Sequence, residues 1–281
     1  MQDIIKNNTT FLIIFCVLLA MAHSASSAMF SFMPEQLAVG IGQEFLAEFF
    51  LDTGNADTIN AMEGTLYYPD ELLELQEIRD GNSIINFWIE RPNKQITGRI
   101  RFSGITPGGY QGQKGFIFST IFKAKAIGNG VVEIREQHVL RNDGQGTAVP
   151  VHISPFRFVI SRTHVPIEPV VKQEDRDPPE AFTLEIARDP NLFENKRFVI
   201  FATQDKGSGI DYYEIQEQRN NFMQDSSWMR VESQYALQDQ RLMSFIFVRA
   251  VDRACNERIA MLDPKSFPQY ARYVLLSILG V

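Results

Sequence analysis

The chain has 281 residues, of which 44% are hydrophobic and 22% charged, and its formal net charge is −7 at pH 7. This mild acidity argues against a nucleic acid or an anionic membrane surface as the partner, since both attract basic patches. The apolar fraction is that of an ordinary globular chain, and the length is sufficient for two domains of about 100 to 150 residues each.

The N-terminus has the pattern of an export signal. Lys6 precedes an uninterrupted apolar run from Phe11 to Ala22, and small residues then lead to Ser26-Ser27-Ala28. The run is too short to cross a bilayer, which takes about 20 apolar residues. The sequence therefore predicts a signal peptide over residues 1–28 and an exported protein, extracellular or at the cell surface.

Short alternating strands follow this leader. Runs of β type are expected at Glu44–Asp52, Ile59–Tyr67, Ile84–Ile89, Ile96–Phe102, Phe116–Ala126 and Val131–Gln137. The leucines of Leu72–Ile78 fit either a strand or a helix, so that segment stays open. Turn residues between the runs, as in Asn142-Asp143-Gly144, favour a β-sandwich or jelly roll.

Framework residues of this half resemble the cohesin family. The segments that carry the likeness are Gly42-Gln43-Glu44-Phe45, Leu51-Asp52-Thr53, Asn60-Ala61-Met62-Glu63-Gly64, Phe102-Ser103-Gly104, Phe122-Lys123-Ala124-Lys125 and Asp143-Gly144. The resemblance covers residues 29–162 and implies a nine-stranded jelly roll related to carbohydrate-binding modules. It also implies a partner, either a dockerin-like protein module or a polysaccharide.

A proline-rich linker is expected at residues 163–181. Its prolines and charges occur without any hydrophobic period, which is typical of a semi-extended spacer. The prolines are Pro166, Pro169, Pro178 and Pro179.

The second half, residues 182–262, resembles the immunoglobulin-like surface modules of bacteria. Strands are expected at Phe198–Ala202, Ile210–Ile215 and Ser244–Val251. The likeness rests on an Asp-x-Ser-Gly-Ile-x-x-Tyr-Glu pattern from Asp205 to Glu214, with two residues inserted, and on Val-x-Ala-x-Asp-x-Ala-Gly-Asn, in which Cys255 replaces the glycine. It implies a second β-sandwich that serves as a spacer or a weak ligand-binding module.

Cysteine usage limits the chemistry further. Because Cys16 lies in the predicted leader, Cys255 is the one cysteine of the mature chain. An internal disulfide and a cysteine-rich zinc site are therefore excluded. We expect Cys255 to be a small buried or turn-lining residue and not a reactive thiol.

No catalytic constellation emerges from the spacing. A glycosidase needs two carboxylates facing one cleft, whereas the acidic residues of the first half stand singly: Glu44, Glu48, Glu63, Glu74 and Glu90. The histidines show no metal-binding spacing: His138, His152 and His164. We expect neither enzymatic activity nor a cofactor.

Three aspartates raise the question of calcium. Asp205, Asp211 and Asp252 are expected near one end of the second sandwich, where oxygen-rich loops can hold a hard cation. The favoured interpretation is that each carboxylate supports its own turn, so no metal site is predicted.

Candidate ligand-binding residues are the aromatic side chains of the first half. A sugar platform would need such rings in a planar row. Strand alternation places Trp88 and its neighbour Phe87 on opposite sides, which favours core or rim positions. The rings in question are Tyr67, Tyr68, Trp88 and Tyr110, of which Tyr68, Trp88 and Tyr110 are the candidate ligand-binding residues.

The C-terminal tail, residues 263–281, ends in an apolar run from Val274 to Val281. Either this run packs on the second domain, or it is the start of a membrane anchor with Tyr270 and Tyr273 at the interface, which is the favoured alternative. We expect an all-β, non-catalytic protein that binds or scaffolds at the cell surface. A carbohydrate-binding component of polysaccharide catabolism and a purely structural stalk stay open as alternatives.

Overall fold

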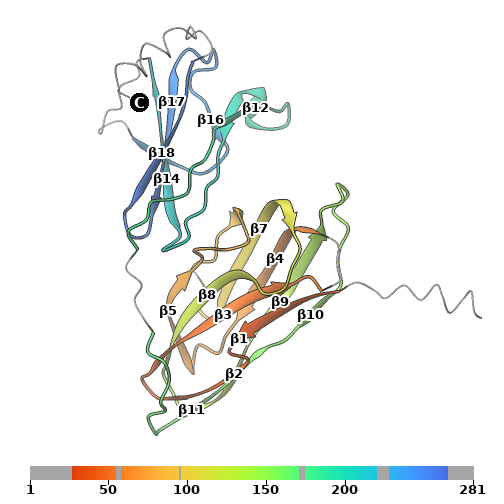
Figure 1. Cartoon of the computed structure of the whole chain (residues 1–281), viewed down its shortest axis with the longest axis vertical. Helices are drawn as coiled ribbons and strands as arrows, with labels where there is room; N and C mark the ends of the chain where they lie inside the picture. The colour runs from red at the N-terminus through yellow and green to blue at the C-terminus, as the bar shows by residue number, and fades with distance from the viewer. Residues whose placement is uncertain (1–26, 55–57, 95, 171–174, 220–227, 265–281) are drawn as a thin grey trace, which may run out of the picture.

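The computed structural model describes residues 27–54, 58–94, 96–170, 175–219 and 228–264. These residues form strands and one short 3-10 helix, η1 (Phe193–Asn195). The strands fall into two groups, which lie one above the other in Figure 1. The all-β fold class predicted from the sequence is thereby confirmed.

The first group contains eleven described strands in two sheets. One sheet has the order β10-β1-β3-β8-β5 and the other β2-β11-β9-β4-β7-β6. The bounds are β1 (Ala28–Met33), β2 (Gln36–Gly40), β3 (Glu44–Asp52), β4 (Ile59–Tyr67), β5 (Leu73–Arg79), β6 (Phe87–Glu90), β7 (Arg99–Tyr110), β8 (Gly115–Ala124), β9 (Gly128–Arg141), β10 (Val151–Ile153) and β11 (Phe156–Ser161).

A phenylalanine-rich core lies between these two sheets. Alternation along β3 turns Phe45 and Phe49 inward, where both are at most 2% exposed. The Phe49 ring lies 5.0 Å from Phe30 and 5.4 Å from Phe118, centroid to centroid. Burying each such ring stabilises the fold by about 2 to 3 kcal/mol, so the sandwich holds together without a disulfide.

Two interruptions explain why eleven strands appear where nine were expected. The chain passes from β1 in one sheet to β2 in the other at Met33-Pro34, and from β10 to β11 at Ser154-Pro155. Proline has no N–H and cannot continue a hydrogen-bonded ladder. Counting each interrupted pair as one strand gives 11 − 2 = 9.

The individual strands largely follow the alternation of the sequence. Leu72–Ile78, which the sequence left open, is a strand (β5). The strand expected at Ile84–Ile89 begins later, at Phe87, since residues 81–86 form the turn that contacts the second group. The strand expected at Ile96–Phe102 begins at Arg99 and continues to Tyr110.

The second group is a smaller sandwich. A sheet of order β12-β13-β16 faces one of order β15-β14-β17-β18, and Val199, Phe201, Ile215 and Val248 fill the space between. The bounds are β12 (Glu185–Arg188), β13 (Arg197–Ile200), β14 (Ile210–Gln218), β15 (Met229–Val231), β16 (Tyr235–Ala236), β17 (Phe245–Asp252) and β18 (Glu257–Leu262).

The two ends of the chain are only partly described. β1 begins at Ala28, whose N–H donates to the Pro150 carbonyl at 2.9 Å, and this is also the last residue of the predicted leader. Residues 1–26 of that leader and 265–281 of the predicted tail lie outside the described residues. Among the described residues, no helix is long and apolar enough to cross a membrane.

Cys255 lies exposed in the turn between β17 and β18, with a backbone φ of 68°. Its N–H donates to the Asp252 carbonyl at 3.1 Å, so it lines a turn and is not buried. A side chain at this left-handed φ is strained by about 1 kcal/mol, whereas glycine is not. This strain explains why the Val-x-Ala-x-Asp-x-Ala-Gly-Asn pattern has glycine at the position of Cys255.

We predict that Cys255→Gly unfolds with a free energy about 1 kcal/mol larger than that of Cys255→Ala, because only glycine relieves the strain at this φ. Urea denaturation under identical reducing conditions compares the two variants. Equal stabilities would show that the turn imposes no such strain.

Candidate functional site

The outer surface of the six-stranded sheet is open and polar over its central strands. We call it the β9-β4-β7 face and define it by Glu63, Thr65, Tyr67, Arg99, Arg101, Glu133, Arg135 and His138, of which Thr65 is buried at 3% exposed. Their neighbours along each strand point into the core, as at Leu66, Ile100 and Ile134. Register places Tyr67 between Glu133 and Arg99, and Thr65 between Arg135 and Arg101.

Tyr67 is at the centre of this face. The guanidinium groups of Arg99 and Arg135 lie 5.0 and 4.8 Å from its ring centroid, one from each neighbouring strand. Its hydroxyl donates to Glu136 Oε1 at 3.4 Å. These contacts hold an aromatic ring and two cations in a fixed arrangement that faces solvent.

Other charges on the face are paired but exposed. His138 Nδ1 lies 2.8 Å from Glu63 Oε1, and their side chains are 66% and 52% exposed. Arg135 Nε donates to Glu133 at 2.7 Å. Exposed pairs of this kind contribute about 0 to 1 kcal/mol each, so these groups can exchange their partners for those of a bound molecule at little cost.

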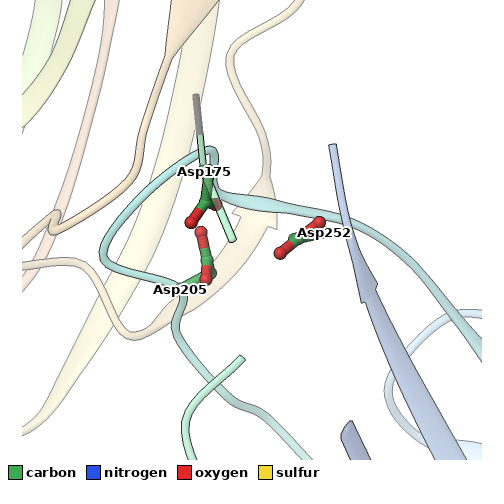
Figure 2. Close-up of side chains that lie close together, drawn as sticks. All are labelled: Asp175, Asp205 and Asp252. Atoms are coloured by element: carbon green, nitrogen blue, oxygen red, sulfur yellow. The ribbon is translucent and has the colours of Figure 1, made fainter. Parts of the chain in front are cut away.

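A second notable cluster consists of three carboxylates. Asp175 comes from the predicted linker, Asp205 from the loop after β13 and Asp252 from the end of β17. Figure 2 shows them pointing toward one another, and oxygens from all three lie within 4.8 Å of each other. Asp205 and Asp252 are only 4% and 1% exposed.

Backbone amides hold the cluster in place. Asp205 Oδ2 accepts hydrogen bonds from the N–H groups of Gly207 and Gly209 at 3.1 and 2.7 Å. Asp252 Oδ1 accepts from Ala254 and Asn256 at 2.9 and 2.7 Å. Asp205 and Asp252 therefore each support their own turn, as the sequence predicts for these two residues.

The membership of the cluster differs from the sequence expectation. Asp211 is exposed on β14 and is not part of it, whereas Asp175 is. Asp175 Oδ2 accepts a hydrogen bond from the Ser208 N–H at 2.7 Å across 33 residues of sequence. No local spacing could have indicated this contact, because the linker showed no pattern.

Burial raises the pKa of Asp205 to about 6, and the charges of Asp175 and Asp252 add to the effect. Burial also disfavours the charge on Asp175, but hydrogen bonds from Ser208, Asp177 and Asp205 together outweigh it and leave that pKa below its usual range. The raised pKa favours a proton on the Asp205 carboxyl group. The oxygens of the three carboxylates are also ligands of the kind that a hard cation such as Ca²⁺ accepts.

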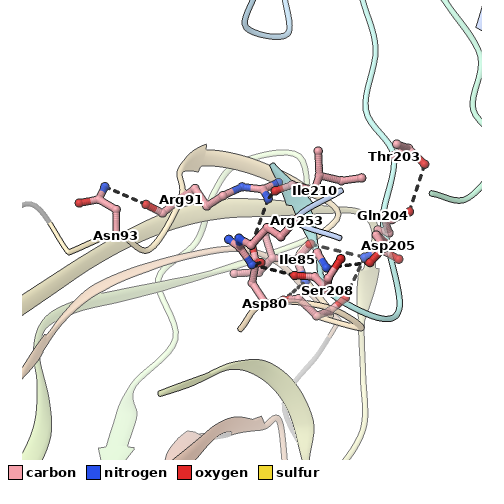
Figure 3. A network of polar contacts seen from close by, with 12 residues as sticks. Asp80, Ile85, Arg91, Asn93, Thr203, Gln204, Asp205, Ser208, Ile210 and Arg253 are labelled. Carbon is pink, nitrogen blue, oxygen red and sulfur yellow. Dashed lines mark hydrogen bonds and ion pairs between the residues drawn. The ribbon is translucent and has the colours of Figure 1, made fainter. Parts of the chain in front are cut away.

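A buried ion pair joins the two sandwiches beside this cluster (Figure 3). The Asp80 side chain, 1% exposed, receives Arg253 Nη1 at 2.6 Å on one oxygen and Arg91 Nη1 at 3.2 Å on the other. Arg91 also donates to the Ile210 carbonyl. One carboxylate of the first sandwich thus binds an arginine from each half.

Hydrogen bonds between the two halves close the same junction. Asn82 N–H donates to the Asp205 carbonyl at 3.1 Å, and Gln204 Nε2 donates to the Ser83 carbonyl at 2.8 Å. A Cβ atom at Gly81 would lie 2.1 Å from the Gly207 oxygen. Only glycine permits this close approach of the two turns.

The three aromatic candidates from the sequence do not form a row. Tyr68 is 8% exposed and its ring lies 5.1 Å from Phe122 in the core, where burial raises its pKa. The Tyr110 hydroxyl donates to the Gln113 carbonyl at 3.1 Å. Trp88 is half-buried and lines a cleft between the sandwiches. Their role in ligand binding stays a prediction.

The sequence matches no protein-family model and no curated protein. Solved structures similar to about half of the chain are cohesins. The seventh ScaB type I cohesin of Pseudobacteroides cellulosolvens is 20% identical with a TM-score of 0.40, over 50% of this chain and 96% of that one. A cohesin in a cohesin–dockerin complex of Clostridium thermocellum is 14% identical with a TM-score of 0.42, over 50% and 97%.

A third similar structure is a non-cellulosomal cohesin of the archaeon Archaeoglobus fulgidus. It is 17% identical to this chain, with a TM-score of 0.39, over 49% of this chain and 92% of that one.

We predict that Asp205→Asn stabilises the protein at pH 7.5 and has little effect at pH 4. The folded pKa of about 6 lies above the ordinary value of 3.8, so the stability that protonated Asp205 contributes is present near pH 4 and is lost as the pH rises through 6. A shift of this size corresponds to about 2 to 3 kcal/mol. Asparagine keeps an acceptor for the two glycine N–H groups.

Thermal unfolding in EDTA at the two pH values measures this effect, with Asp211→Asn as the exposed control, which should match the parent. A loss of stability for Asp205→Asn at pH 7.5 would contradict the assignment.

Proposed function

We propose that this chain is an exported, non-catalytic protein that binds and scaffolds at the cell surface, with the β9-β4-β7 face as its binding surface. The first sandwich holds a partner protein module, and the second, an immunoglobulin-like spacer, carries it. The observation that supports this proposal is the aromatic ring of Tyr67 held between Arg99 and Arg135 on an open sheet surface.

The composition of this face suits a protein partner. Tyrosine and arginine are, with tryptophan, the residue types most enriched at the centres of protein interfaces. Acidic and basic side chains alternate across the strands, so a partner can be selected by charge complementarity as well as by contact area. A sugar platform would instead need several coplanar rings, and Tyr67 is the one aromatic residue among those that define the face.

The sequence resemblance to cohesins names the class of partner: a dockerin-like module carried by another secreted protein. No covalent chemistry is needed for such a role. Because exposed ion pairs on the face are weak, their rearrangement around the partner costs little.

The test is a capture experiment with the full chain. The immobilised chain is incubated with the secreted proteins of its source, and in parallel the soluble chain is incubated with insoluble cellulose and with insoluble chitin. We expect retention of a dockerin-bearing protein, identified by mass spectrometry. Tyr67→Ala with Arg135→Ala should weaken capture by about tenfold or more, as loss of central interface residues does. Glu48→Ala, on the outside of the opposite sheet, is the matched control and should capture as the parent does.

Three outcomes would refute the proposal. Capture that the double variant leaves intact would place the partner elsewhere. Retention on cellulose or chitin alone would make the chain a carbohydrate-binding component of polysaccharide breakdown. Retention of nothing would leave a structural stalk.

A further inference from the structure

A cleft of about 410 Å³ lies between the two sandwiches. Residues 86–89 and Arg91 line it from the first sandwich, and residues 210–213 and 230–234 from the second. The volume is within the range of sites that hold small molecules, about 300 to 1,000 Å³. This cleft is separate from the β9-β4-β7 face.

Contacts on both sides fix the walls of the cleft. Arg91 binds the Ile210 carbonyl and Asp80, which ties the first wall to the second (Figure 3). Within the second wall, the Ser233 hydroxyl donates to the Phe201 carbonyl and accepts from the Phe201 N–H. The cleft is therefore largely pre-formed, and little ordering is needed for a ligand to enter.

Each wall carries half-buried aromatic rings, Phe87 and Trp88 on the first and Tyr212 and Tyr213 on the second. Trp88 of the first wall packs close to Gly104, where an added Cβ would lie 3.4 Å from the indole. Tyr212 of the second wall stacks with Arg230, whose guanidinium is 4.1 Å from the ring centroid. Rings fixed in this way provide flat apolar surface next to polar groups.

Hydrogen-bonding groups that have no partner in the described part of the chain line the same space. The side chains of Asn86, Asp211, Glu232 and Gln234 make no hydrogen bond or ion pair with any residue that the structure describes. Together they offer acceptors and donors to a ligand.

The charges around the cleft balance. Its ionic side chains are the acids Asp211 and Glu232 and the bases Arg91 and Arg230, a net charge of 2 − 2 = 0. The two acids disfavour a polyanion and the two arginines disfavour a cation. A neutral ligand rich in hydroxyl groups, with flat apolar faces, fits this lining best.

From these features we propose that the cleft between the sandwiches binds a short neutral oligosaccharide. Sugar hydroxyls both donate and accept, so they match the carboxylates and amides that have no partner among the described residues. The apolar faces of the sugar rings would rest against Trp88 and Tyr212. This site is additional to the protein-binding face, and either could exist without the other.

Fluorescence of Trp88 in the full chain provides the test. The chain has two tryptophans, so Trp228→Phe leaves Trp88 as the reporter. Cellohexaose, xylohexaose, mannohexaose and chitohexaose are titrated separately to millimolar concentration, and a saturable change is expected with at least one. Tyr212→Ala and Asp211→Ala should each raise the Kd by about tenfold, a loss of about 1.4 kcal/mol.

Tyr67→Ala is the matched control and should bind the sugar as the parent does, while Tyr212→Ala should still capture a dockerin-bearing protein. Thermal midpoints equal to that of the parent establish that the variants fold. Absence of a saturable change with all four oligosaccharides would overturn the proposal. So would sugar binding that Tyr67→Ala abolishes and Tyr212→Ala preserves.

Discussion

A buried carboxylate shared by two arginines determines how the two halves of this protein are joined. Asp80 is almost inaccessible to solvent, and it pairs with Arg91 of its own sandwich and Arg253 of the other. Removing one partner of a fully buried ion pair costs about 3 to 5 kcal/mol, and the cost here is smaller because the Arg91 and Arg253 side chains are 27% and 30% exposed. The interaction therefore favours one relative placement of the sandwiches over a loose tether.

The other features of the junction depend on that placement. The cleft has walls from both sandwiches, so its shape exists only while Arg91 and Ile210 stay in contact. The carboxylate cluster is coupled to it as well, because the Asp205 carbonyl accepts a hydrogen bond from Asn82 of the first sandwich. The β9-β4-β7 face, by contrast, is built within one sheet and needs no support from the second half.

Much of the fold was predictable from the sequence, because alternation of apolar residues reports directly on buried strand faces. β3 and β4 have the predicted bounds, and Cys255 lies in a turn as expected. The missed strands are all short, at most six residues each, and so few residues carry too little pattern: β1, β2, β10, β11, β12, β15, β16 and β18. Asp175 and Asp80 were missed for a different reason: their partners are distant in sequence, and only tertiary structure brings them together.

The candidate sites, like the fold, were only partly predictable from the sequence. Tyr67 and Tyr68 carry the same aromatic signal in the sequence, but alternation directs Tyr68 into the core and leaves Tyr67 half-exposed. Its importance comes from arginines on two adjacent strands, and their register could not be read from one sequence. The sequence predicts Trp88 as a ligand-binding residue. It does not predict the cleft, because the wall opposite Trp88 comes from the second sandwich.

Differential scanning calorimetry of the full chain tests most directly whether the Asp80 ion pair makes the two sandwiches one cooperative unit. With the pair intact, we expect a single transition whose calorimetric and van't Hoff enthalpies agree. Asp80→Ala should split it into two transitions, while Glu63→Ala, which removes an exposed pair, should leave it single. Two separate transitions in the parent, unchanged in Asp80→Ala, would contradict the account.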